Sequence, residues 1–145
     1  MRVVAQRVKQ ACVLVGDDRV GNIEEGLVVL VGFKKGDQEE NARLMAEKLA
    51  NLRIFEDQEG RMNLSALDKQ AQILAISQFT LYADTGKGRR PSFFEALEPA
   101  MAEQLYHKFT ERLREYKLKV ETGVFGAKML VELKNDGPVT LILDT

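Results

Sequence analysis

The chain has 145 residues, of which 45% are hydrophobic and 30% are charged, and its formal net charge is −1. These values are typical of one soluble globular domain that is long enough to bury a core without disulfides or structural metal. Because Cys12 is the only cysteine and His107 the only histidine, an internal disulfide and zinc sites of the CxxC type are excluded.

The first residues, the hydropathy and the net charge of the chain bear on its location in the cell and on its partners. The first ten residues, MRVVAQRVKQ, carry charges at positions 2, 7 and 9, unlike a signal peptide, and no apolar run approaches the roughly 20 residues of a membrane span. We therefore expect a cytoplasmic protein without a membrane anchor. The charge balance gives no basic excess for gripping long duplexes, so DNA is not an expected partner, and a nucleic-acid footprint would be small and local.

The first third of the sequence predicts strands. Residues 3–8 and 11–15 predict two short strands around a turn at 9–10. The apolar, β-branched run GLVVLVGF at 26–33 predicts a central strand that is buried on both faces.

A helix and a second buried strand follow. Asp37 is the expected N-cap of a helix whose apolar residues recur at i, i+4 and i+7 and which ends near Arg53. Residues 57–60 predict a turn, and Ile73–Phe79 predicts the second buried strand.

The last part of the chain begins with a basic loop, TGKGRRPS at 85–92, and then predicts a second helix over Glu98–Lys117. Short strands are expected after it, with the final two joined by a hairpin turn at Asn135-Asp136-Gly137 (119–122, 128–134 and 139–143). Two helices and roughly eight strands predict an α+β fold in a single domain over residues 1–145, with layered, barrel-like β-sheets covered by the two helices. Because two helices cannot cover such long apolar strands, we also expect a homodimer.

The residues of common catalytic sites are scarce. His107 lies about 200° around its helix from the apolar Leu105, so it is interpreted as a surface residue, and Cys12 is interpreted as a small core residue in an apolar strand. No phosphate-binding glycine loop follows a strand, so we expect neither a metal nor a cofactor. An enzyme built from this chain would depend on backbone donors and on a self-reactive substrate.

Two stretches stand out. In SQFTLYAD (77–84), polar residues follow a buried strand, where they either serve a function or satisfy local backbone groups. In NDGPVT (135–140), Asp-Gly favours a hairpin, and proline is tolerated at the first residue of a strand. Alternatively, the Gly137–Pro138 bond is cis, which would turn two successive carbonyls to the same side.

Taken together, these stretches closely resemble the D-aminoacyl-tRNA deacylases. The resemblance covers essentially the whole chain, in the order MRVVAQRV, RIF (53–55), GRMNLS (60–65), SQFTL followed by AD, RRPSF (89–93), TGVFGAKM (122–129) and NDGPVT. It implies a homodimer that hydrolyses the ester of D-aminoacyl-tRNA and of mischarged glycyl-tRNA at an active site between the subunits, without a cofactor.

The resemblance also implies roles for individual residues. Gln78, Phe79 and Thr80 would surround the scissile ester, with the backbone N–H groups of Phe79 and Thr80 stabilising the oxyanion; the competing mechanism uses the Thr80 hydroxyl as nucleophile. Gly137 and Pro138 would form the family's Gly-cisPro motif, which reaches into the other subunit's pocket and rejects L-amino acids.

Further residues would bind the tRNA 3′ end. By resemblance, Ser77 and Phe125 would lie at the terminal adenosine, and the alternative for Phe125 is an ordinary core residue. The basic residues Lys87, Arg89 and Arg90 would contact phosphates of the tRNA acceptor stem. The alternative is that they form a solvated loop without a role in binding. The alternative function is a non-catalytic module that binds the tRNA 3′ end; a dimeric scaffold without an RNA role would need neither SQFTL nor the Gly-Pro pair.

Overall fold

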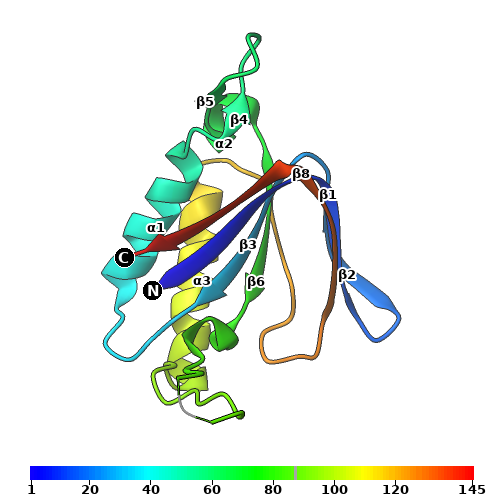
Figure 1. Ribbon diagram of the computed structural model, residues 1–145. Coiled ribbons are helices and arrows are strands. Elements are labelled where there is room, and N and C mark those ends of the chain that lie inside the picture. The colour runs from blue at the N-terminus through cyan, green and yellow to red at the C-terminus, as the bar shows by residue number, and fades with distance from the viewer. Residues whose placement is uncertain (87) are drawn as a thin grey trace.

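The computed structural model describes residues 1–86 and 88–145 of the chain (Figure 1). Within them the chain forms one small α+β domain, and the elements follow in the order β1 (Arg2–Val15), β2 (Asp18–Ile23), β3 (Gly26–Gly32), α1 (Glu39–Asn51), β4 (Phe55–Glu56), β5 (Met62–Leu64), α2 (Ala66–Lys69), β6 (Gln72–Ser77), the 3₁₀ helix η1 (Phe79–Tyr82), α3 (Pro99–Glu115), β7 (Val120–Thr122) and β8 (Leu130–Asp144).

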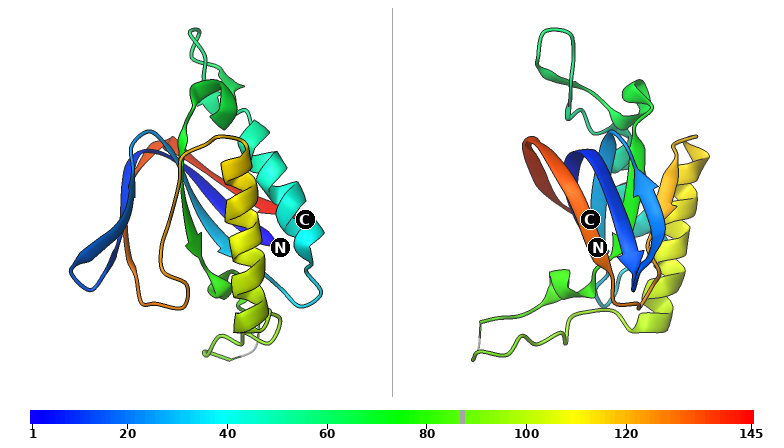
Figure 2. Two further views of the ribbon diagram at one scale, coloured as in Figure 1. Left: turned by 180° about the vertical axis from the view of Figure 1, so that it is seen from behind. Right: turned by 90° about the vertical axis from the view of Figure 1, so that its right-hand side faces the viewer.

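One mixed, strongly curved sheet organises the molecule. Its strands lie in the order β2-β1-β3-β6-β7, and β8 pairs with the other edge of β1. The parallel neighbours β3 and β6 are joined through α1, and β6 and β7 through α3, as parallel strands need a crossover connection. Because the long strands β1 and β8 bend together over the rest of the sheet, the sheet nearly closes into a barrel (Figures 1 and 2).

The two long helices cover one face of this sheet. Leu49 of α1 and Phe109 of α3 are fully buried in one cluster with Leu27 and Val29 of β3. Burying a side chain of this size contributes about 1.5–3 kcal/mol, so this cluster is the main core of the domain. None of the described helices is both long and apolar enough to cross a membrane.

The opposite face of the sheet is covered by the sheet itself. Val8 and Val13 of β1 bury their side chains together with Val28 of β3 and Leu74 of β6 in a second cluster. The prediction that β3 is buried on both faces is confirmed. The second layer comes from the same chain, so the apolar strands do not by themselves require a partner, and the homodimer stays a prediction.

The predicted turn at residues 9–10 is wrong. β1 is continuous from Arg2 to Val15, and its pairing with β8 shifts register around Lys9, so the exposed polar residues mark a bulge. The bulge switches the buried face: the odd-numbered Val3 and Ala5 point into the helix-covered core, whereas Ala11 and Val13, also odd-numbered, point into the second cluster. Cys12 is half-buried with its Sγ 3.4 Å from a Glu132 carboxylate oxygen, so its assignment to the core is also wrong.

The predicted hairpin at Asn135-Asp136-Gly137 is wrong for a similar reason. β8 continues through these residues and pairs with β1 on both sides of them, with Asn135 opposite Val8 and Thr140 opposite Gln6. Residues 136–139 therefore bulge opposite Arg7 alone. The turn-forming residues produce an irregularity inside one strand.

Helix boundaries also differ from the predictions. Gln38, not Asp37, is the N-cap of α1. The buried Asp37 carboxylate instead accepts hydrogen bonds from the Met1 ammonium at 2.8 Å and from the Lys34 N–H at 2.7 Å. Both long helices and the turn at 57–60 are confirmed, whereas α2 and the short strands β2, β4 and β5 were not predicted.

Candidate active site at the end of strand β6

The site is built where β6 ends beside β3. The Gln78 N–H donates to the Val31 carbonyl at 2.8 Å, which holds the first residue after β6 against the neighbouring strand. Gly32 makes this approach possible, because a Cβ there would lie 2.9 Å from the Gln78 carbonyl oxygen. The chain then turns into η1, so the strand ends at Ser77, two residues earlier than the predicted Phe79.

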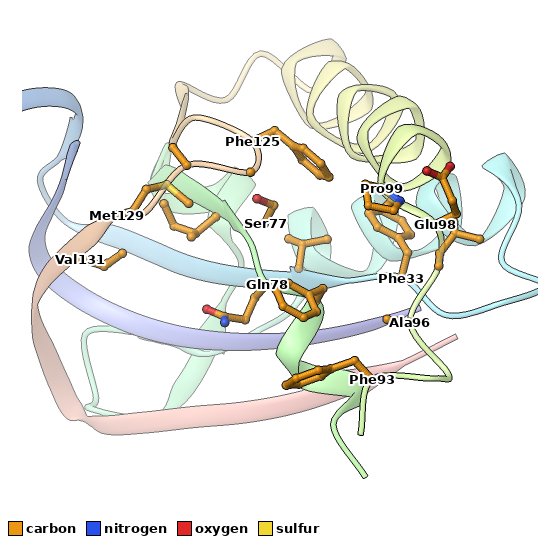
Figure 3. Close-up of a pocket in the computed structure, with 17 residues that line it drawn as sticks. Phe33, Ser77, Gln78, Phe93, Ala96, Glu98, Pro99, Phe125, Met129 and Val131 are labelled. Atoms are coloured by element: carbon orange, nitrogen blue, oxygen red, sulfur yellow. The ribbon is translucent and has the colours of Figure 1, made fainter. Parts of the chain in front are cut away.

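A cavity of about 580 Å³ opens at this point. Its walls come from the ends of β3 and β6, from η1, from the segment before α3, and from the loop between β7 and β8 (Val31, Phe33, Ile76, Ser77, Gln78, Phe79, Phe93, Ala96, Leu97, Glu98, Pro99, Ala102, Phe125, Gly126, Ala127, Met129 and Val131). Figure 3 shows Ser77 and Gln78 between Phe125 on one side and Phe93 on the other. A mostly apolar cavity with a few polar groups is the usual form of a small-ligand site.

Two backbone donors are free beside the cavity. As the first residues of a 3₁₀ helix, Phe79 and Thr80 have no intrahelical acceptor for their N–H groups. Among the described residues no other acceptor bonds to them either. The Thr80 hydroxyl accepts a hydrogen bond from the Gln78 amide, so Gln78 and Thr80 restrain each other.

Aromatic side chains form both sides of the cavity. The rings of Phe79 and Phe93 meet edge to face with centroids 4.9 Å apart, although Phe79 is still 57% exposed. On the opposite side Phe125 lies 5.9 Å from the ring of the buried Tyr106, whose hydroxyl donates to the Ala75 carbonyl at 2.8 Å. Burial raises the pKa of Tyr106 well above its ordinary value, so it remains a neutral donor.

Few ionisable groups line the cavity. Among the lining residues in the described part of the chain, only Glu98 has an ionisable side chain, and its carboxylate accepts a hydrogen bond from the Met101 N–H at the start of α3. His107 is exposed on α3, as predicted, and does not line the cavity. Over residues 1–86 and 88–145, no three His, Cys, Asp or Glu side chains gather in an arrangement that could hold a metal ion.

The structure brings some of the predicted site residues together. Ser77, Gln78, Phe79 and Phe125 all line the cavity, and Thr80 follows directly in η1. Phe125 lines the cavity and also packs against the main core cluster, so its role at the adenosine stays a prediction beside its role in the core.

Other predicted residues lie elsewhere. Gly137 and Pro138 are exposed on β8 and do not line the cavity of their own chain. The peptide bond between them is cis. Arg7, only 3% exposed, stands behind this bulge, with Nε 3.3 Å from the Asp136 carbonyl oxygen and Nη1 2.8 Å from that of Ile54.

The predicted phosphate contacts belong to an exposed loop. Arg89 and Arg90 are exposed and do not line the cavity, and Lys87 lies outside the described residues. The loop begins and ends at a two-residue bridge, in which the Asp84 N–H donates to the Ser92 carbonyl at 2.7 Å and the Ser92 N–H donates back at 2.9 Å.

Several cavity residues were not predicted. Phe93 lies in the RRPSF motif and Met129 in the TGVFGAKM motif, each without an assigned role, and Phe33, Glu98 and Pro99 lie in segments predicted as a buried strand or a helix start. Only their meeting in three dimensions makes them part of the site, and no local signal in the sequence could have indicated it.

Comparisons with known proteins place the chain in a family. The family model for D-Tyr-tRNA(Tyr) deacylase matches residues 4–144. The chain is 57% identical to a protein of Brevibacillus brevis and 55% identical to one of Thermosipho africanus, both named D-aminoacyl-tRNA deacylase. These matches cover all of this chain and 100% and 97% of those proteins, respectively.

Solved structures agree with this result. A structure named c-Myc DNA Unwinding Element Binding Protein is 41% identical, with a TM-score of 0.93, and the match covers 100% of this chain and 99% of that one. A structure described as a probable eukaryotic D-amino acid tRNA deacylase shares the fold at 21% identity, with a TM-score of 0.87 over 99% of this chain and 98% of that one. Sequence and fold therefore agree over the full length, and the chain belongs to the D-Tyr-tRNA(Tyr) deacylase family.

Proposed function

We propose that this chain hydrolyses the ester of D-aminoacyl-tRNA, and of mischarged glycyl-tRNA, to free amino acid and tRNA. The observation that carries the proposal is the cavity at the end of β6, with the unpaired N–H groups of Phe79 and Thr80 beside it. The relatives named D-aminoacyl-tRNA deacylase support the choice of substrate. We expect the protein to act in the cytoplasm as a chiral proofreader of translation.

The reaction is hydrolysis assisted by backbone donors. The oxygen of a water molecule attacks the ester carbonyl carbon, and negative charge develops on the carbonyl oxygen. The N–H groups of Phe79 and Thr80 stabilise that charge, and one well-aimed donor of this kind is typically worth about 2.7–4 kcal/mol. The C–O bond to the ribose then breaks, and the proton given up by the attacking water passes to the leaving ribose 3′ oxygen. The neighbouring 2′-hydroxyl of the adenosine can relay protons, so part of the catalysis is supplied by the RNA.

The Thr80 hydroxyl is a poor candidate for the nucleophile. A nucleophilic hydroxyl needs a neighbouring base. Over residues 1–86 and 88–145, the one hydrogen bond between the Thr80 Oγ1 and a side chain is the one it accepts from the Gln78 amide, which cannot take up its proton. Glu98, the one ionisable side chain in the described lining of the cavity, is the N-cap of α3 and bonds to that helix.

Rejection of L-amino acids is assigned to Gly137 and Pro138 of a second copy of the chain. Both residues are exposed and lie outside their own chain's cavity, so they are available to a neighbour. Backbone groups that fill the space where an L side chain must go would exclude the L-ester by steric overlap, whereas a D side chain points away. Glycine has no side chain to exclude, so glycyl-tRNA would also be accepted.

The terminal adenosine would lie against Phe125, with Ser77 beneath it. Arg89, Arg90 and Lys87 are proposed to contact phosphates of the acceptor stem. The similar structure named for DNA binding does not favour the same role here, because a net charge of −1 suits a small, local nucleic-acid contact.

Turnover distinguishes this function from a non-catalytic module that binds the tRNA 3′ end. D-Tyr-tRNA in large excess over the protein should be hydrolysed through many cycles, and glycyl-tRNA should be hydrolysed as well. Retention of D-Tyr-tRNA with no release of tyrosine above the spontaneous rate would contradict the proposal and identify a binding module.

A further inference from the structure

Phe94 is an unexplained exposed aromatic residue next to the cavity. Its side chain is 74% exposed, more than that of any other large hydrophobic residue in the described part of the chain. It directly follows Phe93 of the cavity wall, in a turn closed by the Ala96 N–H donating to the Phe93 carbonyl at 3.0 Å. It therefore contributes nothing to the core and stands at the edge of the site.

The ring is held in place from one side. The Lys35 Nζ lies over the Phe94 ring, 3.2 Å from the centroid. The two segments are also joined through their backbones, because the Lys35 N–H donates to the Glu95 carbonyl at 3.0 Å and the Leu97 N–H donates to the Phe33 carbonyl at 3.0 Å. The lysine and the backbone bonds fix one face of the ring, and the exposed fraction leaves the other face open.

Positive charge accompanies this ring. Lys34 and Lys35 follow Phe33 of the cavity wall, Arg89 and Arg90 belong to the loop that precedes Phe93, and all four are exposed. In the described part of the chain, none of the four has a carboxylate oxygen within 4.0 Å. An open aromatic face beside unpaired cations is the combination that binds single-stranded nucleic acid, in which a base stacks on the ring and a phosphate meets a cation.

We propose that Phe94, supported by Lys35, stacks with the base of the nucleotide that precedes the terminal adenosine. The inference rests on the proposed function, because it takes the cavity as the site of the aminoacylated adenosine. The RNA strand that ends in the bound adenosine must leave the cavity at its rim. Phe93 lines the cavity and Phe94 is exposed directly beside it, so an aromatic surface continues from the inside of the cavity to the outside. The site would bind a pyrimidine or purine base with little preference, since stacking is tolerant of sequence.

Three substrates of increasing length test this inference. They are the D-tyrosyl esters of adenosine, of the dinucleotide cytidylyl-adenosine, and of full tRNA. The readout is the gain in kcat/KM that each added piece gives. The variants are Phe94→Leu, which keeps an apolar side chain but removes the aromatic face, and Phe94→Tyr, which keeps the face. Met62→Leu is the matched control, because Met62 is 55% exposed on β5 and does not line the cavity.

For the wild-type chain and the Met62→Leu control, we expect the dinucleotide ester to exceed the adenosine ester in kcat/KM. In Phe94→Leu that gain should fall by about tenfold, the scale of a single base–aromatic stack, and Phe94→Tyr should restore it. An equal effect of Phe94→Leu on the adenosine ester and the dinucleotide ester would overturn the inference while leaving the proposed function intact. A sedimentation experiment in which the Phe94→Leu variant shifts from dimer toward monomer would also overturn the inference. That result would mean that Phe94 packs against a second copy of the chain and not against a base. If the wild-type chain hydrolysed none of the three esters, the proposed function itself would be refuted.

Discussion

At the scale of single residues, Thr80 separates the two mechanisms, since its hydroxyl and its N–H group can be removed independently. Thr80→Ala removes the hydroxyl and keeps the donor, so we expect kcat on D-Tyr-tRNA to stay within about threefold of the wild type. Thr80→Pro removes the N–H group, and the loss of one oxyanion donor typically lowers kcat by about 10²–10³-fold.

Steady-state deacylation by the two variants, with circular dichroism to confirm that both are folded, gives the answer. If Thr80→Ala alone reduced the rate to that of spontaneous hydrolysis, the hydroxyl would be the nucleophile and the backbone mechanism would be wrong.

Tyr106 links the core to the site and makes a prediction about pH. Its pKa is raised by burial, and burial also raises the pKa of Tyr82 to about 12, both above the ordinary value of about 10. Below pH 10 the folded and unfolded states are both protonated, so the full stability is present. Above pH 10 the unfolded state releases protons that the folded state keeps, so the free energy of unfolding falls by up to about 1.4 kcal/mol per pH unit for the buried Tyr106, and by less for the partly exposed Tyr82.

Tyr106→Phe tests this directly. Near pH 7 the variant should lose about 1 kcal/mol, because the bond from the hydroxyl to the Ala75 carbonyl is removed while that carbonyl keeps the bond from the Gly123 N–H. Urea denaturation between pH 9 and pH 11 should then show a shallower decline than in the wild type. An unchanged slope would mean that Tyr106 does not keep its proton in the folded state.

Sequence alone could group only residues that are neighbours in the chain, and their roles in the reaction stay predictions. Ser77, Gln78 and Phe79 lie in one stretch after a buried strand, and the structure places them together at the cavity. Phe93 and Glu98 reach the same cavity only because the segment before α3 is bonded to the end of β3, for example from Leu97 to Phe33. Contacts of this kind depend on tertiary structure and leave no local pattern.

At the scale of elements, the bulge of β8 decides how the Gly137–Pro138 edge is presented. Gly137 has φ +117°, and a Cβ there would lie 2.8 Å from the Val139 Cγ2 and 3.1 Å from the Arg7 Nη2. Gly137→Ala should therefore displace this edge and lower the ratio of D-Tyr-tRNA to L-Tyr-tRNA hydrolysis by about tenfold or more, because an L side chain would be excluded less strictly.

Gly60→Ala is the matched control, since Gly60 also has a positive φ, +75°, but no atom within 4 Å of the added Cβ. It should lose a similar amount of stability to backbone strain and keep the full D/L ratio. A Gly137→Ala variant that is folded and retains the wild-type ratio would show that this edge does not exclude L-amino acids.

The same bulges explain the errors in the predicted strands. Polar and turn-forming residues at 9–10 and 135–138 indicate turns when only neighbouring residues are considered. In the structure the segments on both sides of each irregularity pair with the same neighbouring strand, so the chain bends and continues. A turn and a bulge use similar residues, and long-range pairing decides between them.

At the scale of the whole molecule, the proposed exclusion of L-amino acids requires a second copy. We expect sedimentation velocity to give a dimer of twice 16.3 kDa at micromolar concentration. Dilution below the dissociation constant of the dimer should reduce the D/L ratio, since the excluding edge would be withdrawn. A monomer at all concentrations that still discriminates between the enantiomers would contradict the cross-subunit arrangement.

The overall architecture was only partly predictable. Apolar strands and two amphipathic helices predicted an α+β domain with barrel-like sheets, and the structure confirms it. The reason for expecting a partner was wrong, because β1 and β8 curl over the second face of the sheet and bury Val8, Val13 and Val28 within one chain. Sheet curvature comes from bulges and twist along long strands, which the hydrophobic pattern does not specify.

The central claim is tested most directly by the ratio of kcat/KM for D-Tyr-tRNA to that for L-Tyr-tRNA, measured with the wild-type chain under identical conditions. Steric exclusion of the L side chain predicts a ratio of about 100 or more, with the L-ester hydrolysed near its spontaneous rate. A ratio near one, or faster hydrolysis of the L-ester, would contradict the account.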